Sequence, residues 1–177
     1  MTNFKLQLFQ LEGEELASFL SENEWTYHAN PSRSRHEILS KVDAGYYSDG
    51  RETYWMIEDD EKLGVLMIDD IEDTIPIIDI RIAPTSRGKG VGRKTLEWLK
   101  DYLFGQRGKI RIEGYTRADN LAMRKCFTNA GFVKEGYLRK AWENHDGTVN
   151  DSVLYAAISD DWRTKTITEI DINQLPY

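Results

Sequence analysis

The sequence predicts a single α/β domain, and three observations support this fold class. The chain has 177 residues, 40% of them hydrophobic, which suffices for one buried core and is short for two domains. Segments of strand-like alternation and of helical periodicity follow one another in the order β α α β β β α β α β β. Two pairs of strands are joined by short polar turns, as in antiparallel hairpins.

The first half of the chain supplies four strands and two helices. Phe4, Leu6 and Leu8 alternate with polar residues and predict a half-buried strand. Leu16, Phe19 and Leu20 then share one helical face, and Asn30-Pro31 predicts the start of a second helix. Three further strands are expected over residues 53–58, 63–69 and 75–83, of which the first two form a hairpin.

The second half begins with the strongest helical pattern, from Gly88 to about Phe104. A strand over 109–115 follows, and Asp119 is expected to cap a helix that ends at Gly131. Strands over 132–142 and 148–159 flank a turn rich in Asn, Asp and Gly and form the last hairpin. We divide the chain into a domain over residues 1–162 and a polar C-terminal tail over 163–177.

The charge balance excludes several function classes. The chain has 23 Lys and Arg against 30 Asp and Glu, a formal net charge of −7. Nucleic acids and anionic membranes are bound through clustered positive charge, so neither is an expected partner. The apolar runs are shorter than the roughly 20 residues of a spanning helix, and the N-terminus lacks a signal-peptide pattern. With one cysteine, which cannot form an internal disulfide, a cytoplasmic location is expected.

The most informative segment is Arg87-Gly88-Lys89-Gly90-Val91-Gly92-Arg93-Lys94, between a predicted strand and the start of the strongest helix. Glycines allow a ligand to approach the backbone, and the first N–H groups of a helix attract phosphate oxygens. A Walker A loop would need a glycine where Arg93 stands, and a dinucleotide-binding loop would need one there too. The segment therefore predicts a phosphate site of another kind, with a solvated basic turn as the alternative.

Two blocks of sequence carry a family resemblance. The spacing Arg87-x-x-Gly90-x-Gly92 at a strand-to-helix junction resembles the acetyl-CoA-binding motif of the GNAT N-acetyltransferase superfamily. The block from Asn120 through Phe127 to Ala130-Gly131-Phe132 is similar to the helix that this family places beside pantetheine. The segment 135–139, with Asp146-Gly147, Asp151, Tyr155 and Asp161-Trp162, resembles the closing hairpin of the branch that includes ribosomal-protein N-terminal acetyltransferases.

This resemblance covers roughly residues 4–162 and implies the GNAT fold. That fold has a mixed central sheet of about seven strands, helices on both faces, and a splayed pair of parallel strands that holds acetyl-CoA. The resemblance places the strand edge that pairs with pantetheine at Ile82 and Ala83. It places the pyrophosphate beside Arg87 and on the backbone N–H groups of Gly88, Lys89, Gly90, Val91 and Gly92.

Two residues of the second block have expected contacts of their own. Asn120 is expected to reach the pantetheine arm. Lys125 is expected to contact the cofactor, with a solvated helix position as its alternative. No metal site is expected, because His28, His36 and His145 lack cysteine or paired-carboxylate neighbours at ligand spacing.

Acyl transfer to an amine needs a group that accepts a proton. Strand parity places Asp79 and Glu113 on the polar faces of two strands, which would line one site if the strands are neighbours. We predict Glu113 as the general base and Asp79 as the second choice. The alternative is that both carboxylates pair with arginines, at positions 81 and 111.

The general acid is the point of departure from the family. Many GNAT enzymes carry a tyrosine seven residues after the helix asparagine, and this chain has Phe127 there. A thiol has a pKa of about 8.5, so its thiolate can leave without a strong acid. Tyr115, Tyr155 or an ordered water is expected to replace the missing hydroxyl.

The expected function is transfer of an acetyl group from acetyl-CoA to a primary amine by direct attack in a ternary complex. The acceptor is left open between a protein N-terminus and a small cationic amine such as a polyamine or an aminoglycoside, and the acidic surface favours a cation. The alternatives are a non-catalytic CoA-binding regulatory module, which Phe127 keeps open, and a nucleotide-binding phosphotransferase. A homodimer is a family expectation.

Overall fold

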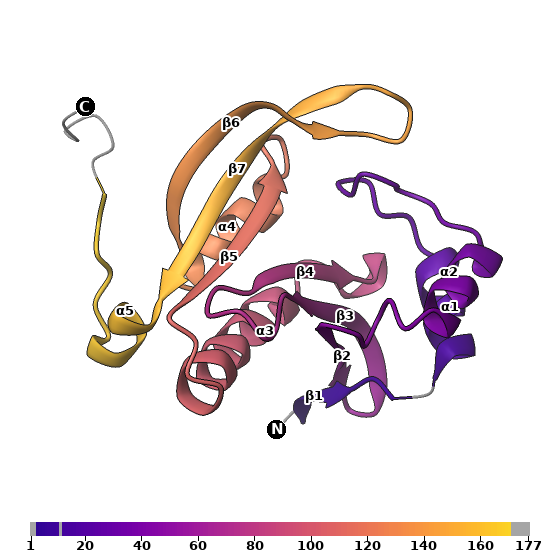
Figure 1. Ribbon diagram of the computed structural model, residues 1–177, viewed down its shortest axis with the longest axis horizontal. Coiled ribbons are helices and arrows are strands. Elements are labelled where there is room, and N and C mark those ends of the chain that lie inside the picture. The colour runs from indigo at the N-terminus through magenta and orange to yellow at the C-terminus, as the bar shows by residue number, and fades with distance from the viewer. Residues whose placement is uncertain (1–2, 11, 171–177) are drawn as a thin grey trace.

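Seven strands form one mixed sheet in the computed structural model, which describes residues 3–10 and 12–170. The strand order is β1-β2-β3-β4-β5-β7-β6 (Figure 1). Strands β4 and β5 run parallel, and the other neighbours run antiparallel. The predicted α/β class and mixed sheet are confirmed. The strands are β1 (Phe4–Leu8), β2 (Arg51–Glu58), β3 (Glu61–Asp69), β4 (Ile77–Ile82), β5 (Arg111–Arg117), β6 (Val133–Glu143) and β7 (Val149–Ile158).

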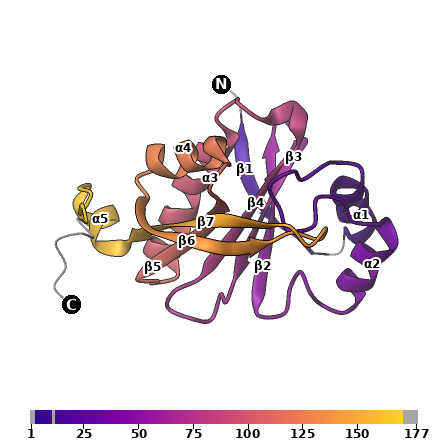
Figure 2. The same ribbon diagram turned by 90° about the horizontal axis from the view of Figure 1, so that it is seen from above.

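Helices cover both faces of the sheet (Figures 1 and 2). Helices α3 (Val91–Lys100) and α4 (Leu121–Asn129) pack on one face, and α1 (Gly13–Ser21) and α2 (Arg35–Asp43) pack on the other. Successive strand residues point to opposite faces, so Met56 enters the α3–α4 core while Trp55 enters the α1–α2 core. None of the helices described is long and apolar enough to cross a membrane.

Two predicted helix starts are wrong, and each has a local cause. Helix α2 begins at Arg35, because Ser34 and Glu37 form a reciprocal capping box, with Ser34 Oγ accepting from Glu37 N at 3.2 Å. The cap of α4 is Asn120, whose Oδ1 accepts from Met123 N at 3.2 Å. Asp119 does not cap because its carboxylate binds the guanidinium of Arg117.

Strands β4 and β5 pair over a very short stretch. In the described chain their register contains Ile77–Glu113 and Ile78–Gly114, and beyond these positions the strands diverge. The ring of Phe127 lies against Gly114 at the last paired position and stacks on Tyr155, with ring centroids 5.1 Å apart. The splayed parallel pair is therefore present, with an aromatic ring packed where the strands begin to part.

The predicted boundary after residue 162 falls inside α5 (Ser159–Thr164). Trp162 lies 6.0 Å from Phe104 between ring centroids, and its Nε1 donates to Asp101 at 2.8 Å. Beyond the helix, Thr168 N donates to Asp161 at 2.9 Å. The rest of the predicted tail, residues 171–177, lies outside the described residues, and the division of the chain stays a prediction.

The close approach of Phe127 to Gly114 leads to a stability test. A Cβ atom at Gly114 would lie 2.4 Å from Phe127 Cζ, so Gly114→Ala should lower the free energy of unfolding by about 1–3 kcal/mol through overpacking. Urea denaturation measures this. The matched control is Gly136→Ala in β6, where the new Cβ would meet Leu154 at an ordinary 3.6 Å. Equal losses in the two variants would contradict the packing role of Gly114.

Candidate functional site

The glycine segment forms a tight turn into α3. Gly88 and Gly90 have φ angles of 74° and 82°, a left-handed conformation that side chains disfavour. Gly90 is the N-cap residue and offers no side-chain cap. The first hydrogen bond of the helix runs from Lys94 N to Gly90 O at 3.1 Å. The N–H groups of residues 91–93 therefore have no acceptor within the helix and are available to an anion.

A cavity of about 560 Å³ opens at this turn, and we call it the glycine groove. Its walls come from the α1–α2 loop (residues 22–34), β4, the glycine segment and α4. Most of the predicted cofactor residues line it: Ile82, Arg87, Gly88, Gly90, Val91, Gly92, Asn120 and Lys125. Ala83 and Lys89 are not among the lining residues.

The free edge of β4 forms one wall of the glycine groove. Ala83 N donates to Leu63 O of β3 at 2.9 Å. Because backbone groups alternate in direction along a strand, those of Ile80 and Ile82 point the other way, toward β5. At that level β5 has diverged. The backbone of Ile80 and Ile82 therefore faces the gap, whereas that of Ala83 faces β3.

Two predicted polar contacts are already engaged within the chain. Arg87 Nε donates to Ile82 O at 3.0 Å, and its Nη2 donates to Glu24 O at 3.1 Å. The guanidinium thus joins the end of β4 to the α1–α2 loop. The side chain of Asn120 caps α4 and donates to Thr116 Oγ1 at 3.1 Å.

A second cavity of about 340 Å³ lies where β4 and β5 part, and we call it the splay cavity. It shares Tyr27, His28, Ile80, Asn120 and Met123 with the glycine groove, so the two hollows adjoin. Asp79 and Tyr115, both predicted catalytic residues, line the splay cavity. Glu113 is not among the residues that line either cavity.

Asp79 is held between two basic side chains. His28 Nε2 lies 2.9 Å from Asp79 Oδ1, and Arg81 donates to Oδ2 through Nη2 at 2.9 Å. Burial alone would raise the pKa of Asp79, but the charges and hydrogen bonds of Arg81 and His28 hold it far below its usual value. An anion stabilised in this way is a weak proton acceptor and a good partner for orienting the imidazole.

Glu113 belongs to an ion-pair cluster on the same face of the sheet. Its Oε1 accepts from Arg111 Nε at 2.7 Å, and Oε2 accepts from Tyr115 at 3.0 Å. Arg111 also binds Glu135 with two hydrogen bonds, of 3.0 and 2.6 Å. Burial and the hydrogen bond to Glu113 raise the pKa of Tyr115. The carboxylates Asp79 and Glu113 therefore do not share a cavity, and each pairs with an arginine two positions away.

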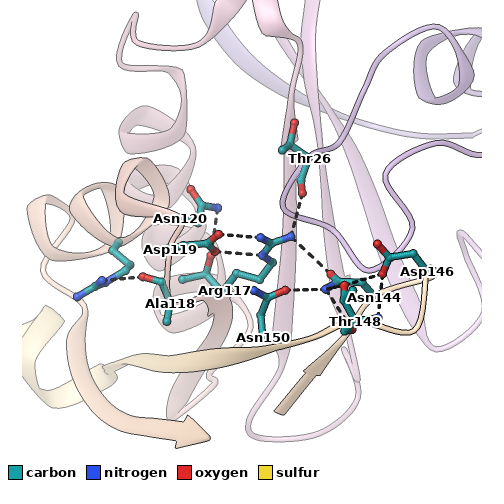
Figure 3. A network of polar contacts seen from close by, with 11 residues as sticks. Thr26, Arg117, Ala118, Asp119, Asn120, Asn144, Asp146, Thr148 and Asn150 are labelled. Atoms are coloured by element: carbon teal, nitrogen blue, oxygen red, sulfur yellow. Dashed lines mark hydrogen bonds and ion pairs between the residues drawn. The ribbon is translucent and has the colours of Figure 1, made fainter. Parts of the chain in front are cut away.

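The α1–α2 loop is tied to the sheet and to the β6–β7 turn (Figure 3). Arg117 binds both carboxylate oxygens of Asp119, at 3.0 and 2.7 Å, and donates to Thr26 O at 3.2 Å and Asn144 Oδ1 at 3.5 Å. The N–H of His145 donates to Ala29 O at 2.8 Å. These bonds hold the loop beside the splay cavity, which residues of the loop help to line.

Sequence reasoning missed several cavity residues, namely His28, Arg33 and Trp142. In the sequence His28 is notable only as a possible metal ligand, Arg33 lies in a loop, and Trp142 lies near a hairpin turn. No local pattern brings them together, because the loop reaches the cavity through the tertiary contacts of Arg117 and His145. Cys126, which also lines the glycine groove, has its pKa raised to about 11 by burial and is therefore a poor nucleophile.

Comparison with known proteins gives one family match. The model of the acetyltransferase (GNAT) family matches residues 15–132. A search of curated protein sequences finds no match.

Similar solved structures include spermidine N-acetyltransferases. A chimera of that enzyme from Vibrio cholerae and hSSAT is 17% identical, with a TM-score of 0.79 over 90% of this chain and 98% of the other. The Vibrio cholerae enzyme in complex with CoA and spermine is 18% identical, with a TM-score of 0.77 over 90% and 98%. A dodecameric form of it is 17% identical, with a TM-score of 0.76 over 92% and 97%. At these identities the likeness concerns the fold alone.

The environment of Asp79 predicts a pH-dependent stability. The folded-state pKa lies below the unfolded value, so this carboxylate stabilises the fold above about pH 4 and loses that effect as pH falls. Asp79→Asn should lower the free energy of unfolding by roughly 3 kcal/mol at pH 7, because buried Arg81 loses its partner. The difference from the unmodified chain should narrow between about pH 4 and pH 2.

Urea denaturation across this pH range makes the measurement. Asp60→Asn is the control, since the Asp60 side chain is 98% exposed and the substitution should change stability little. A loss in Asp79→Asn that stays constant with pH would contradict the role assigned to the charge of Asp79.

Proposed function

The chain belongs to the GNAT acetyltransferase family, and we propose that it acetylates a primary amine bound in the splay cavity, with acetyl-CoA bound in the glycine groove. The family match confirms the predicted superfamily, the acetyl-CoA-dependent N-acetyltransferase class and the co-substrate. The observation that carries the proposal is the junction of the two cavities at His28, Ile80 and Asn120. Reactants held on either side of that junction would meet for direct attack in a ternary complex.

The glycine groove suits a long ligand with an anionic end. Its volume of about 560 Å³ lies within the usual range of ligand sites, about 300–1,000 Å³. The first turn of α3 offers N–H groups and the positive end of the helix dipole for a pyrophosphate. The backbone groups of Ile80 and the N–H of Ile82 are left for hydrogen bonds to amide groups of a pantetheine arm, since the Ile82 carbonyl already accepts from Arg87. Acetyl-CoA supplies an activated thioester to this groove.

The splay cavity must supply a proton acceptor, because only the free amine is nucleophilic. His28 fits this role better than either carboxylate. Its imidazole lines both cavities, and Asp79 fixes its Nε2 at 2.9 Å. A neutral imidazole with Nε2–H directed at a carboxylate keeps Nδ1 as its basic atom. Asp79 is then a positioning residue. The role of Glu113 as general base stays a prediction, and its ion pair with Arg111 argues against that role.

The departing thiolate has no dedicated acid at position 127. Phe127 is buried in the α3–α4 core and stacks on Tyr155. Among the predicted replacements, Tyr115 is the hydroxyl best placed to protonate the thiolate, since it lines the splay cavity. A thiolate leaving group needs only weak assistance, so solvent can supply the proton.

The narrower expectations stay predictions. These are the ribosomal-protein branch, a protein N-terminus or a small cationic amine as acceptor, a homodimer, and a cytoplasmic location. Bound spermine and a dodecameric assembly are features of the Vibrio cholerae enzyme structures. The competing function, a CoA-binding module without catalysis, differs in one observable. It would bind CoA and release no thiol from acetyl-CoA with any amine.

Gly90 provides a test of cofactor binding. Its φ of 82° is strained for any side chain, and no atom lies within 4 Å of a Cβ built there. Gly90→Ala should therefore distort the turn and raise the KM for acetyl-CoA about tenfold, equivalent to the roughly 1–2 kcal/mol of a left-handed residue. Thiol release measures KM. The control is Gly50→Ala, with φ of 66° and the same open surroundings before β2. An equal KM effect in the control would contradict the location of the cofactor.

The pH dependence of turnover tests the proton acceptor. His28→Gln should lower kcat by about 10²-fold or more and remove the acidic limb of the kcat profile, because general-base catalysis is worth about that much. His36→Gln, on the exposed face of α2, should leave both unchanged. Glu113→Gln should keep the acidic limb. Loss of that limb in Glu113→Gln with its retention in His28→Gln would return the role to Glu113.

A further inference from the structure

The charged side chains that line the splay cavity have a net charge opposite in sign to that of the whole chain. The molecule carries −7, yet the charged side chains that line this cavity are Arg33, Arg81 and Asp79. These three side chains together carry a net charge of +1. A local excess of positive charge in an acidic protein selects an anionic group on the ligand.

The negative charge of the wall is already neutralised. Both oxygens of Asp79 are in use, Oδ1 with His28 at 2.9 Å and Oδ2 with Arg81 at 3.2 and 2.9 Å. Among the described residues, no other carboxylate lines the splay cavity. A polyamine in this cavity would therefore meet two guanidinium groups and no free counter-charge.

Two buried donors in the wall lack partners. The Arg81 side chain is 5% exposed, and its Nη1 is buried with no hydrogen-bond partner in the described chain. Nε1 of Trp142, in the same wall, is also buried and unpartnered. Neither group can accept a hydrogen bond. A buried donor without a partner is costly, so this wall favours a ligand group rich in hydrogen-bond acceptors.

We propose that the acetyl acceptor is a small amine that carries a carboxylate, of the size of an α-amino acid. Its carboxylate would bind Arg81 and Arg33, and its amino group would face His28 and the strand gap. The inference rests on the proposed function and narrows its substrate class. The cavity of about 340 Å³ and the bond that ties His145 N to Ala29 O suit a small molecule better than a folded protein's terminus.

The experiment compares acceptors that differ only in the carboxylate. Release of thiol from acetyl-CoA is measured with a panel of α-amino acids, their primary amides and the corresponding decarboxylated amines, together with spermidine and an N-terminal peptide. At least one amino acid should exceed its own amide in kcat/KM by about tenfold or more, as expected for a charged hydrogen-bonded pair. Equal rates for acid and amide, or higher rates with spermidine or the peptide, would overturn the inference.

A variant pair assigns the preference to the cavity wall. Arg33→Gln should raise the KM of the preferred amino acid about fivefold or more and leave the KM of its amide unchanged. Arg35→Gln, an exposed arginine two positions further on that pairs with Glu14, should change neither. An effect of the same size on acid and amide would contradict carboxylate binding by Arg33.

Failure of the inference and failure of the proposed function give different results. If amines are acetylated without regard to a carboxylate, the acetyltransferase function stands and the substrate class is wrong. If no amine in the panel releases thiol while CoA still raises the Tm, the proposed function fails as well, and the CoA-binding module replaces it.

Discussion

The short pairing of β4 and β5 is the constraint on which the rest of the site depends. Two residue pairs join these parallel strands, after which the backbone of Ile80 and Ile82 has no strand partner. Unpaired backbone groups inside a sheet are costly unless a ligand or water satisfies them. The sheet remains intact because β3 pairs with the whole of β4 and β7 with the whole of β5. The gap therefore leaves the sheet continuous on either side of a slot between β4 and β5.

The α1–α2 loop converts this slot into a site with two compartments. Contacts of Arg87, Arg117 and His145 with loop carbonyls hold the loop over the gap. The loop brings His28 to Asp79 and Arg33 to the cavity wall. The glycine turn lines one compartment with backbone N–H groups, and charged side chains line the other. This separation of environments suits the proposed reaction, since acetyl-CoA ends in phosphates and the amine must lose a proton.

Local patterns were sufficient for the fold and for the glycine turn that begins α3. Period-two alternation predicted β1 and β5, and apolar runs and hairpin turns predicted the other strands. The glycines at 88 and 90 marked the turn, because their left-handed φ angles favour glycine. The splay cavity depended on tertiary contacts. Parity placed Asp79 and Glu113 on one face, but the divergence of the strands separates them into a cavity and an ion-pair cluster. His28 reaches Asp79 across 51 positions of sequence, a distance over which no spacing rule operates.

The central claim is that a ligand with the backbone-pairing groups of CoA fills the β4–β5 gap. Amide hydrogen exchange followed by NMR, with and without CoA, tests it most directly. In the free protein the amides of Ile80 and Ile82 should exchange fast, because they face the gap, whereas Arg81 and Ala83 are protected by β3. Addition of CoA should slow exchange at Ile80 or Ile82 and leave Arg81 and Ala83 unchanged. Binding of CoA that protects neither Ile80 nor Ile82 would contradict the account.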